Sequence, residues 1–345
     1  MTDNWRAYLT DQGAQWDQQG VRGFDSGPSR ERDAQLFALG HLGYLTVTGP
    51  EARKFLQGQV TCDMSLVTID HSQPGAHCNT KGRMVFSFQA VQLAISSPES
   101  DSFALIMHRG LLQRAREALA KFIVFSRAEL SSEQGHNLIG LAGARSLPLL
   151  PELLPRIPIA KHDVVQADGS LGVRVNGDRF LCLVNGGESA PALWRAWAEH
   201  CSLRGYPDWN LANIRDGLGE VVPGCEELFI PQMLNMQVTG GVSFNKGCYI
   251  GQEVVARMQY LGKLKRHMRR AQVNMAEAPP PGSPVYAQES AQSVGNIVLT
   301  APAADNTIEL LAVTTDSAFD SDALFADPQR TQKLHLLPLP YVITK

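Results

Sequence analysis

The sequence predicts an α+β protein that ends in a β-rich domain. Up to about residue 240, β-rich runs alternate with amphipathic helical patterns, and no glycine-rich dinucleotide or Walker fingerprint lies among them. After Arg257 the character changes, because short β segments are separated by Gly, Pro and Asn. That pattern is typical of a small barrel or sandwich. We place the boundary between the two parts within residues 240–262.

The first elements are a predicted strand and helix on either side of Pro50. Residues 44–48 are β-rich, Pro50 suits the first turn of a helix, and Gly58 suits its C-terminal stop. The segments "GRMVFSFQAVQL" and "SFALIM" are typical of two buried strands.

The following elements alternate in the same way. The segment "RGLLQRAREALAKF" has apolar residues at helical spacing, and the four prolines of "SLPLLPELLPRIP" predict a connection. In "LGVRVNGDRFLCLV", two β-rich runs around Asn176-Gly177 predict a hairpin with a tight turn. The segment "APALWRAWAEHC" then predicts a helix.

Composition narrows the classes of function. Lysine and arginine number 31 against 34 acids, so the net charge of −3 argues against a nucleic-acid scaffold held by bulk charge. A small molecule or a protein is the expected partner. The N-terminal residues show no signal or transit pattern, and no apolar run is long enough for a membrane helix. We therefore expect a cytoplasmic protein whose six scattered cysteines are reduced.

Cys248 is the first candidate for chemistry, and four roles are open to it: nucleophile, metal ligand, redox thiol or packing residue. Gly247 and Gly251 lie on either side and allow tight turns and close approach of a ligand. Lys246 and Arg257 supply positive charge that favours the thiolate. A packing role is the simplest alternative for any free cysteine.

No metal site is expected. Cys225 and Cys248 are far apart in sequence and neither belongs to a CxxC pair, so a permanently bound metal or cluster is disfavoured. A cysteine hydrolase would need a histidine base, and the sequence does not indicate which of nine histidines would serve. Trp209 is either a core aromatic or a stacking plate for a flat heterocycle.

Charged residues follow the cysteine. Glu253 and Arg257 are spaced to form a surface ion pair if this segment is helical. From Arg257 to Arg270 there are six basic residues and no acid. Such a run is either a solvated face or a region that attracts the carboxylates of an anionic ligand.

Several segments together resemble one protein family. The motif "KGCYIGQE", Lys246 to Glu253, is the hallmark of the YgfZ family, whose members are relatives of the glycine-cleavage T-protein and carry a folate-binding domain. The resemblance covers nearly the whole chain. Its further segments are "GPEARKFLQGQVTCD", "HCNTKGRM", "FIPQMLN", "GGVSF" and "GKLKRHMRR".

The resemblance implies a fold and a function. The fold is three-lobed and T-protein-like: two α+β lobes form a folate-binding region over residues 1–240, residues 241–262 carry the hallmark connection, and residues 263–345 form a C-terminal β-barrel. The function is that of a cytosolic, monomeric protein that binds tetrahydrofolate or a derivative. It assists assembly or repair of iron–sulfur client proteins, and so affects tRNA modification indirectly, without binding nucleic acid or a membrane itself.

The chain departs from T-proteins at the position of a catalytic acid. T-proteins have an Asp essential for aminomethyl transfer just after the segment that corresponds to Lys81-Gly82. Here Val85 and Phe86 occupy those places. Without a carboxylate to orient the folate amine and handle protons, that transfer is not expected, and the resemblance favours a protein that is not an enzyme.

The predicted pterin contacts also differ in part. Where T-proteins place an acid before a glycine, this chain has Arg215, with Asp216 one step on. In a strand, one step leads to the opposite face. Trp209 matches a family aromatic near the folate, whereas the other expected aromatic is Leu42 here, with Tyr44 two positions further.

The hallmark residues complete the hypothesis. Cys248 is the candidate reactive or partner-contacting thiol, Lys246 and Arg257 are its electropositive surroundings, and Glu253 orients them. Lys246 and Tyr249 are also candidate folate contacts. Two alternatives stay open: a folate-dependent one-carbon transferase, and an interaction module with a vestigial folate pocket.

Overall fold

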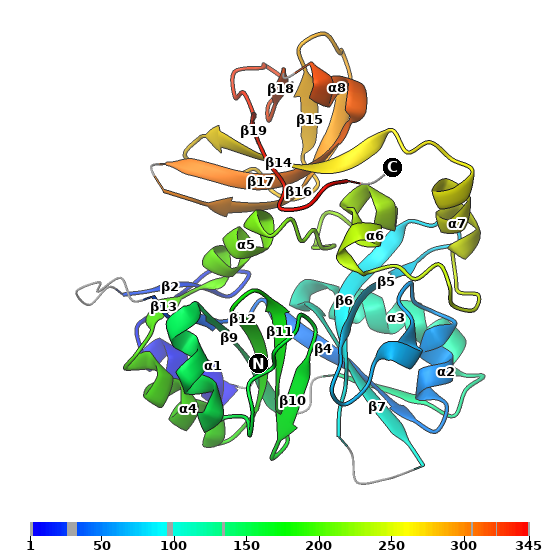
Figure 1. Cartoon of the computed structure of the whole chain (residues 1–345). Helices are drawn as coiled ribbons and strands as arrows, with labels where there is room; N and C mark the ends of the chain where they lie inside the picture. Colours follow the sequence, from blue (N-terminus) through cyan, green and yellow to red (C-terminus); the bar gives the residue numbers. More distant parts are fainter. Residues whose placement is uncertain are drawn as a thin grey trace. The chain divides into compact units, whose positions relative to one another are not determined.

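The computed structural model describes residues 3–25, 33–94, 99–132, 135–304, 306–321 and 323–343. The helices and strands of the chain are shown in Figure 1. The chain divides into two compact units. Unit 1 consists of residues Met1–Phe55, Met64–Gln73 and Gln89–Trp209, and unit 2 of Leu56–Asp63, Pro74–Phe88 and Asn210–Lys345. Segments far apart in sequence therefore share each unit.

Unit 1 begins with helix α1 and a small hairpin and contains a six-stranded sheet with the order β10-β11-β12-β9-β3-β13. Neighbouring strands are antiparallel except β13, which runs parallel to β3. The bounds are α1 Asp3–Asp11, β1 Ala14–Trp16, β2 Val21–Phe24, β3 Gln35–Ala38, β9 His136–Ala142, β10 Val164–Ala167, β11 Ser170–Asn176, β12 Arg179–Asn185, α4 Ser189–Ala198 and β13 Ser202–Arg204.

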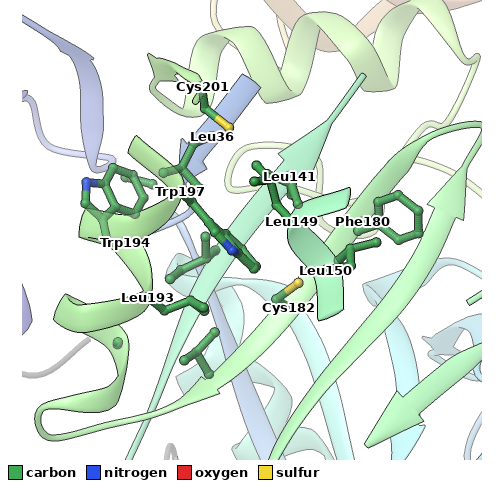
Figure 2. Close-up of a cluster of buried hydrophobic side chains, with 14 of the residues drawn as sticks. Leu36, Leu141, Leu149, Leu150, Phe180, Cys182, Leu193, Trp194, Trp197 and Cys201 are labelled. Carbon is green, nitrogen blue, oxygen red and sulfur yellow. The ribbon is translucent and has the colours of Figure 1, made fainter. Parts of the chain in front are cut away.

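The core beside this sheet is built around two tryptophans of α4. Trp194 and Trp197 are fully buried with Leu141 and Phe180 of the sheet (Figure 2). Trp5 of α1 meets Trp194 edge-on, with ring centroids 5.6 Å apart. The predicted helix is thus confirmed, and its aromatic face supplies much of the apolar burial that stabilises this part of unit 1.

The predicted hairpin is also confirmed. Strands β11 and β12 pair antiparallel, with Asn176 opposite Arg179, so the turn consists of Gly177 and Asp178. Gly177 has a φ of +51°, a left-handed conformation that glycine adopts without steric cost.

The second sheet has the order β5-β6-β7-β4-β8. It contains the strand predicted before Pro50 as β4 and the two predicted buried strands as β6 and β7, and the helix predicted after Pro50 forms as α2. Its helix α3 buries Ala115 and Leu119, as the helical spacing predicts, whereas Phe122 on the same helix is partly exposed. The bounds are β4 Leu42–Gly49, α2 Ala52–Gln57, η1 Met64–Leu66, β5 Gln73–Cys78, β6 Met84–Gln92, β7 Asp101–His108, η2 Arg109–Leu111, α3 Leu112–Ile123 and β8 Glu129–Ser132.

The proline-rich connection contains regular structure that the sequence did not indicate. It forms a 3-10 helix, η3 (Ala144–Glu152), with Pro148 and Pro151 inside it. This turn places Leu149 and Leu150 in the core. Their burial stabilises helical geometry in a segment whose prolines disfavour a longer α-helix.

The strand geometry expected around Arg215 is wrong, because that residue is the last of helix α5 (Tyr206–Arg215). Pro207 lies in the first helical turn, where a missing N–H costs little. Successive helical positions turn by about 100°, so Asp216 is not on the face opposite Arg215.

Unit 2 contains an antiparallel six-stranded sheet with the order β18-β15-β16-β17-β14-β19, which confirms that the C-terminal part of the chain is β-rich. The two ends of the sheet approach each other: Phe325 of β18 bridges to Lys333, and the N–H of Leu334 donates to the carbonyl of Leu324. The sheet therefore curls towards a barrel. The bounds are η4 Pro231–Leu234, α6 Met236–Thr239, α7 Gln252–Tyr260, β14 Arg266–Asn274, β15 Pro284–Ala287, β16 Ser293–Pro302, β17 Thr307–Thr315, α8 Asp316–Asp320, β18 Leu324–Phe325 and β19 His335–Leu337.

A buried carboxylate ties the end of α5 to this sheet. Glu309 of β17 accepts hydrogen bonds from Arg215 at 2.8 Å and from Arg270 of β14 at 2.6 Å. Burial alone would raise the pKa of Glu309, but the two guanidinium groups outweigh it and hold that pKa below its ordinary value. Among the described residues, no helix is both long and apolar enough to cross a membrane.

Candidate functional site

The hallmark segment, residues 246–253, lies in unit 2 and runs from the loop after α6 into the first turn of α7. All six cysteines fall within the described ranges, and Cys248 alone is exposed. Burial raises the pKa of four of the other five to about 12: Cys62, Cys78, Cys182 and Cys225. Because the thiolate is the reactive form, the exposed thiol of Cys248 is the one that chemistry with an external molecule would use.

Lys246 turns the other way and is bound by main-chain oxygens. Its ammonium nitrogen donates to the carbonyl oxygens of Gln57, Val60 and Cys62 at 2.8, 2.7 and 2.7 Å. Burial lowers the pKa of Lys246 to about 8, against the opposing effects of Cys62 and Asp63. The ammonium has three N–H donors, and three carbonyls accept them, so Lys246 anchors the hallmark segment to the turn at residues 57–62.

Tyr249 lies on the buried side with Lys246. The lysine nitrogen is 5.1 Å from the centroid of the Tyr249 ring, which is a cation–π distance. Burial raises the pKa of the Tyr249 hydroxyl, and the nearby Cys78 adds to that effect. The side chains at 246 and 249 thus point inward, while Cys248 between them faces solvent.

Two glycines fix where the hallmark segment meets the loop after β5. Gly251 has a φ of +82°, and a Cβ there would collide with the carbonyl oxygen of Asn79. Gly82 has a φ of +70°, and a Cβ there would lie 2.9 Å from the Cβ of Val254 on α7. Both positions need glycine for backbone conformation and for close approach. The "TKG" and "IGQE" segments therefore pack against each other in the fold.

Glu253 and Arg257 lie on α7 and are both exposed. Within the described ranges they form no ion pair with each other, although their spacing permits one. The carbonyl of Arg257 accepts the N–H groups of Leu261 and Gly262, which closes the end of the helix.

The three candidate folate contacts of unit 1 come together, but inside its core. Trp209, Leu42 and Tyr44 belong to one buried cluster and are 3%, 7% and 1% exposed. The Arg179 guanidinium carbon lies 4.6 Å from the Trp209 ring centroid, and Phe37 meets that ring edge-on. These residues therefore do not form an open stacking surface for a pterin. Arg179, on β12, carries no sequence pattern that singles it out.

The two remaining candidates lie in unit 2. Arg215 is bound to Glu309, and Asp216 follows the end of α5. The positions that replace the T-protein acid are apolar and buried: Val85 and Phe86 lie in β6, and Phe86 stacks on His77 with ring centroids 5.3 Å apart. No proton-handling side chain stands at either position. In the described parts of the chain, no three His, Cys, Asp or Glu residues are grouped to hold a metal ion.

Known proteins resemble the chain over nearly its whole length. It is 30% identical to the tRNA-modifying protein YgfZ of Yersinia enterocolitica over 321 residues, which cover 92% of this chain and 95% of that protein. The chain belongs to the YgfZ family. The YgfZ protein of Pectobacterium carotovorum is also 30% identical, over 90% of this chain and 92% of its own length. No protein-family model matches the sequence.

A solved structure of another protein has the same fold as this YgfZ family member. Aminomethyltransferase T of the glycine cleavage system from Bartonella henselae matches with a TM-score of 0.73, over 98% of this chain and 97% of that protein. Sequence identity is 16%, so the likeness concerns the fold alone. The predicted T-protein-like fold is thereby confirmed.

The burial of the other thiols predicts selective labelling of Cys248. Iodoacetamide added to the native protein should alkylate one cysteine, because the other five are buried and burial raises the pKa of four of them. Peptide mass spectrometry should locate the adduct at Cys248, and Cys248→Ser should remain unlabelled until denaturant is added. Adducts at two or more sites in the native protein would contradict the exposed-thiol assignment.

The carbonyl contacts of Lys246 predict a cost for its removal. Lys246→Met should lower the free energy of unfolding by about 2–4 kcal/mol, because a charged donor is lost and three carbonyls lose their partner. Urea denaturation measures this, and hydrogen exchange should rise in residues 57–62. The exposed Lys263→Met is the matched control, expected to change stability by less than about 0.5 kcal/mol. Equal effects of the two substitutions would show that the anchor adds no stability.

Proposed function

We propose that this protein is an auxiliary factor for the assembly or repair of iron–sulfur proteins, with Cys248 as its functional thiol. The observation that carries the proposal is the contrast between one exposed cysteine on an anchored segment and five buried ones. The relatives are named tRNA-modifying proteins. A role in maturing the iron–sulfur enzymes that thiolate tRNA would account for that name without direct binding of tRNA.

The surroundings of the thiol support an encounter with a large partner. Cys248 is exposed, whereas the adjacent Tyr249 is buried and Lys246 is held by three carbonyls. The segment is therefore fixed on its inner side and accessible on its outer side. A thiol presented in this way is able to meet a group on the surface of another protein.

We further propose that the protein binds tetrahydrofolate or a derivative. Support comes from the T-protein-like fold together with the family resemblance. The closed packing of Trp209, Leu42 and Tyr44 disfavours pterin stacking on that indole unless Arg179 moves.

A one-carbon transferase is the less favoured alternative. The places of the T-protein acid hold the buried apolar side chains of Val85 and Phe86. An aminomethyl-transfer assay that gives turnover would favour the transferase. A pure interaction module would bind no folate at all.

Titration with tetrahydrofolate tests the ligand. Isothermal calorimetry should give saturable binding to the wild-type protein. Because Trp209 is enclosed, Trp209→Phe should change the Kd by less than about threefold, well under the effect of losing a stacking partner, which is about 1–3 kcal/mol. A loss of tenfold or more would show that the indole stacks on the ligand and that Arg179 moves. Absence of heat with the wild type would contradict folate binding.

Complementation tests the thiol. In cells that lack their own YgfZ protein, Cys248→Ser should fold and bind folate like the wild type, yet fail to restore the activity of iron–sulfur enzymes. The loss follows because serine keeps the shape of the side chain without the thiol. Asn245→Ser, at the exposed position just before the hallmark segment, is the matched control and should restore activity. Full restoration by Cys248→Ser would mean that the segment acts through its shape and charge.

A further inference from the structure

An exposed apolar pair stands at the end of helix α7. Tyr260 is 66% exposed and Leu261 is 85% exposed. Burying apolar side chains of this size is favourable, so an exposed neighbouring pair marks a possible contact with a partner. These two residues and the exposed cations close to them in sequence are called the α7-end surface; the cations are Arg257, Lys263, Lys265 and Arg266.

The α7-end surface is fixed relative to the hallmark segment. The N–H groups of Leu261 and Gly262 donate to the Arg257 carbonyl at 2.9 and 2.8 Å, which holds Leu261 against the helix end. The ring of Tyr260 meets the ring of Phe244 edge-on, with centroids 6.0 Å apart. Phe244 precedes Cys248 by four residues, and all these residues belong to unit 2. The apolar pair and the exposed thiol therefore belong to the same compact unit, and the contact between Tyr260 and Phe244 connects the segments that carry them.

The charges of the surface are unbalanced. Between Val254 and Ala276 the sequence contains no acid. Two cations of this stretch are neutralised, because Arg269 pairs with Asp316 and Arg270 pairs with Glu309. The four cations of the α7-end surface form no ion pair within the described ranges. Two cations within β14 are thus neutralised, whereas the four of the α7-end surface, including Arg266 at the start of β14, are available to a partner.

We propose that the α7-end surface docks an acidic segment of a client protein, with an apolar client side chain seated on Tyr260 and Leu261. This inference rests on the proposed function and adds to it the place and chemistry of client recognition. An apolar anchor surrounded by charges of one sign is a common plan for a protein interface, in which the anchor gives affinity and the charges give orientation and encounter rate.

A protein partner fits these features better than RNA or a membrane. A phosphate backbone has no apolar group that could pack on an exposed leucine. The chain as a whole carries a net charge of −3, which opposes bulk attraction to nucleic acid. A lipid surface would need a longer apolar face than one tyrosine and one leucine provide. An acidic peptide segment with one apolar side chain would pair with the exposed cations and also pack on Tyr260 and Leu261.

Site-specific cross-linking tests the proposal in the full-length protein. A photoreactive benzoylphenylalanine is placed at Leu261 in cells that lack their own YgfZ protein, and the cross-linked residue is mapped by mass spectrometry. The expected result is attachment within acidic segments of iron–sulfur proteins. The matched control places the same group at Phe125, which is 87% exposed at the end of α3 in unit 1, and should not capture those segments. Cross-links to RNA, to lipid, to segments without acids, or to nothing would overturn the proposal.

Charge reversal supplies the second arm. Lys263→Glu combined with Lys265→Glu should reduce the cross-linking yield at Leu261 by about tenfold, since like charges across an interface repel. It should also impair restoration of the iron–sulfur enzymes while leaving native alkylation of Cys248 intact. Arg116→Glu combined with Lys121→Glu, two exposed cations of α3, is the control and should change neither. If the Lys263 and Lys265 reversal has no effect but Cys248→Ser still fails, docking at this surface is wrong and the thiol role stands. If neither the charge reversal nor Cys248→Ser has an effect, the docking proposal and the thiol role are both wrong.

Discussion

The ammonium group of Lys246 is the contact on which the candidate site depends. A partly buried cation is stable only where acceptors replace its lost water, and here three carbonyls of residues 57–62 do so. The same turn is held from a second direction, because Thr61 donates its hydroxyl to the Gly241 carbonyl and accepts the N–H of Ser243 at its own carbonyl. These contacts join chain segments nearly two hundred residues apart. They also fix the position at which the hallmark segment begins, at Lys246.

This anchor explains the order of residues in the hallmark motif. With Lys246 held inside and Tyr249 buried beneath it, the chain has little freedom between them, and Cys248 is left on the outside. Gly251 then turns the chain through a left-handed conformation into α7. The exposure of the thiol is thus a consequence of how its neighbours are bound. A cysteine in a flexible loop would also be exposed, but it would not be held in one place.

The sequence predicted what depends on local pattern and missed what depends on distant backbone. The hairpin at Gly177 and the helix with Trp194 were predictable, because turn chemistry and apolar spacing are local. Lys246 is bound by main-chain carbonyl oxygens, which every residue has. No residue type in the sequence therefore indicates where these acceptors lie. Arg179, on strand β12, contacts the ring of Trp209, on helix α5, and only the tertiary fold reveals that contact. The helix at Arg215 was misread because a position carried over from relatives was given strand geometry.

The thiol and the α7-end surface are coupled through α7. Val255 buries the inner side of the helix, and Gly82 allows Val254 to approach the loop after β5 closely. The start of the helix is therefore fixed beside the hallmark segment, and its last turn presents Tyr260 and Leu261. In the proposed role, a client docked at the helix end is held to the unit that carries Cys248, which raises the effective concentration of its reacting group near the thiol. Under this proposal, client recognition needs an acidic segment with one apolar side chain, and the chemistry needs the accessible thiol of Cys248.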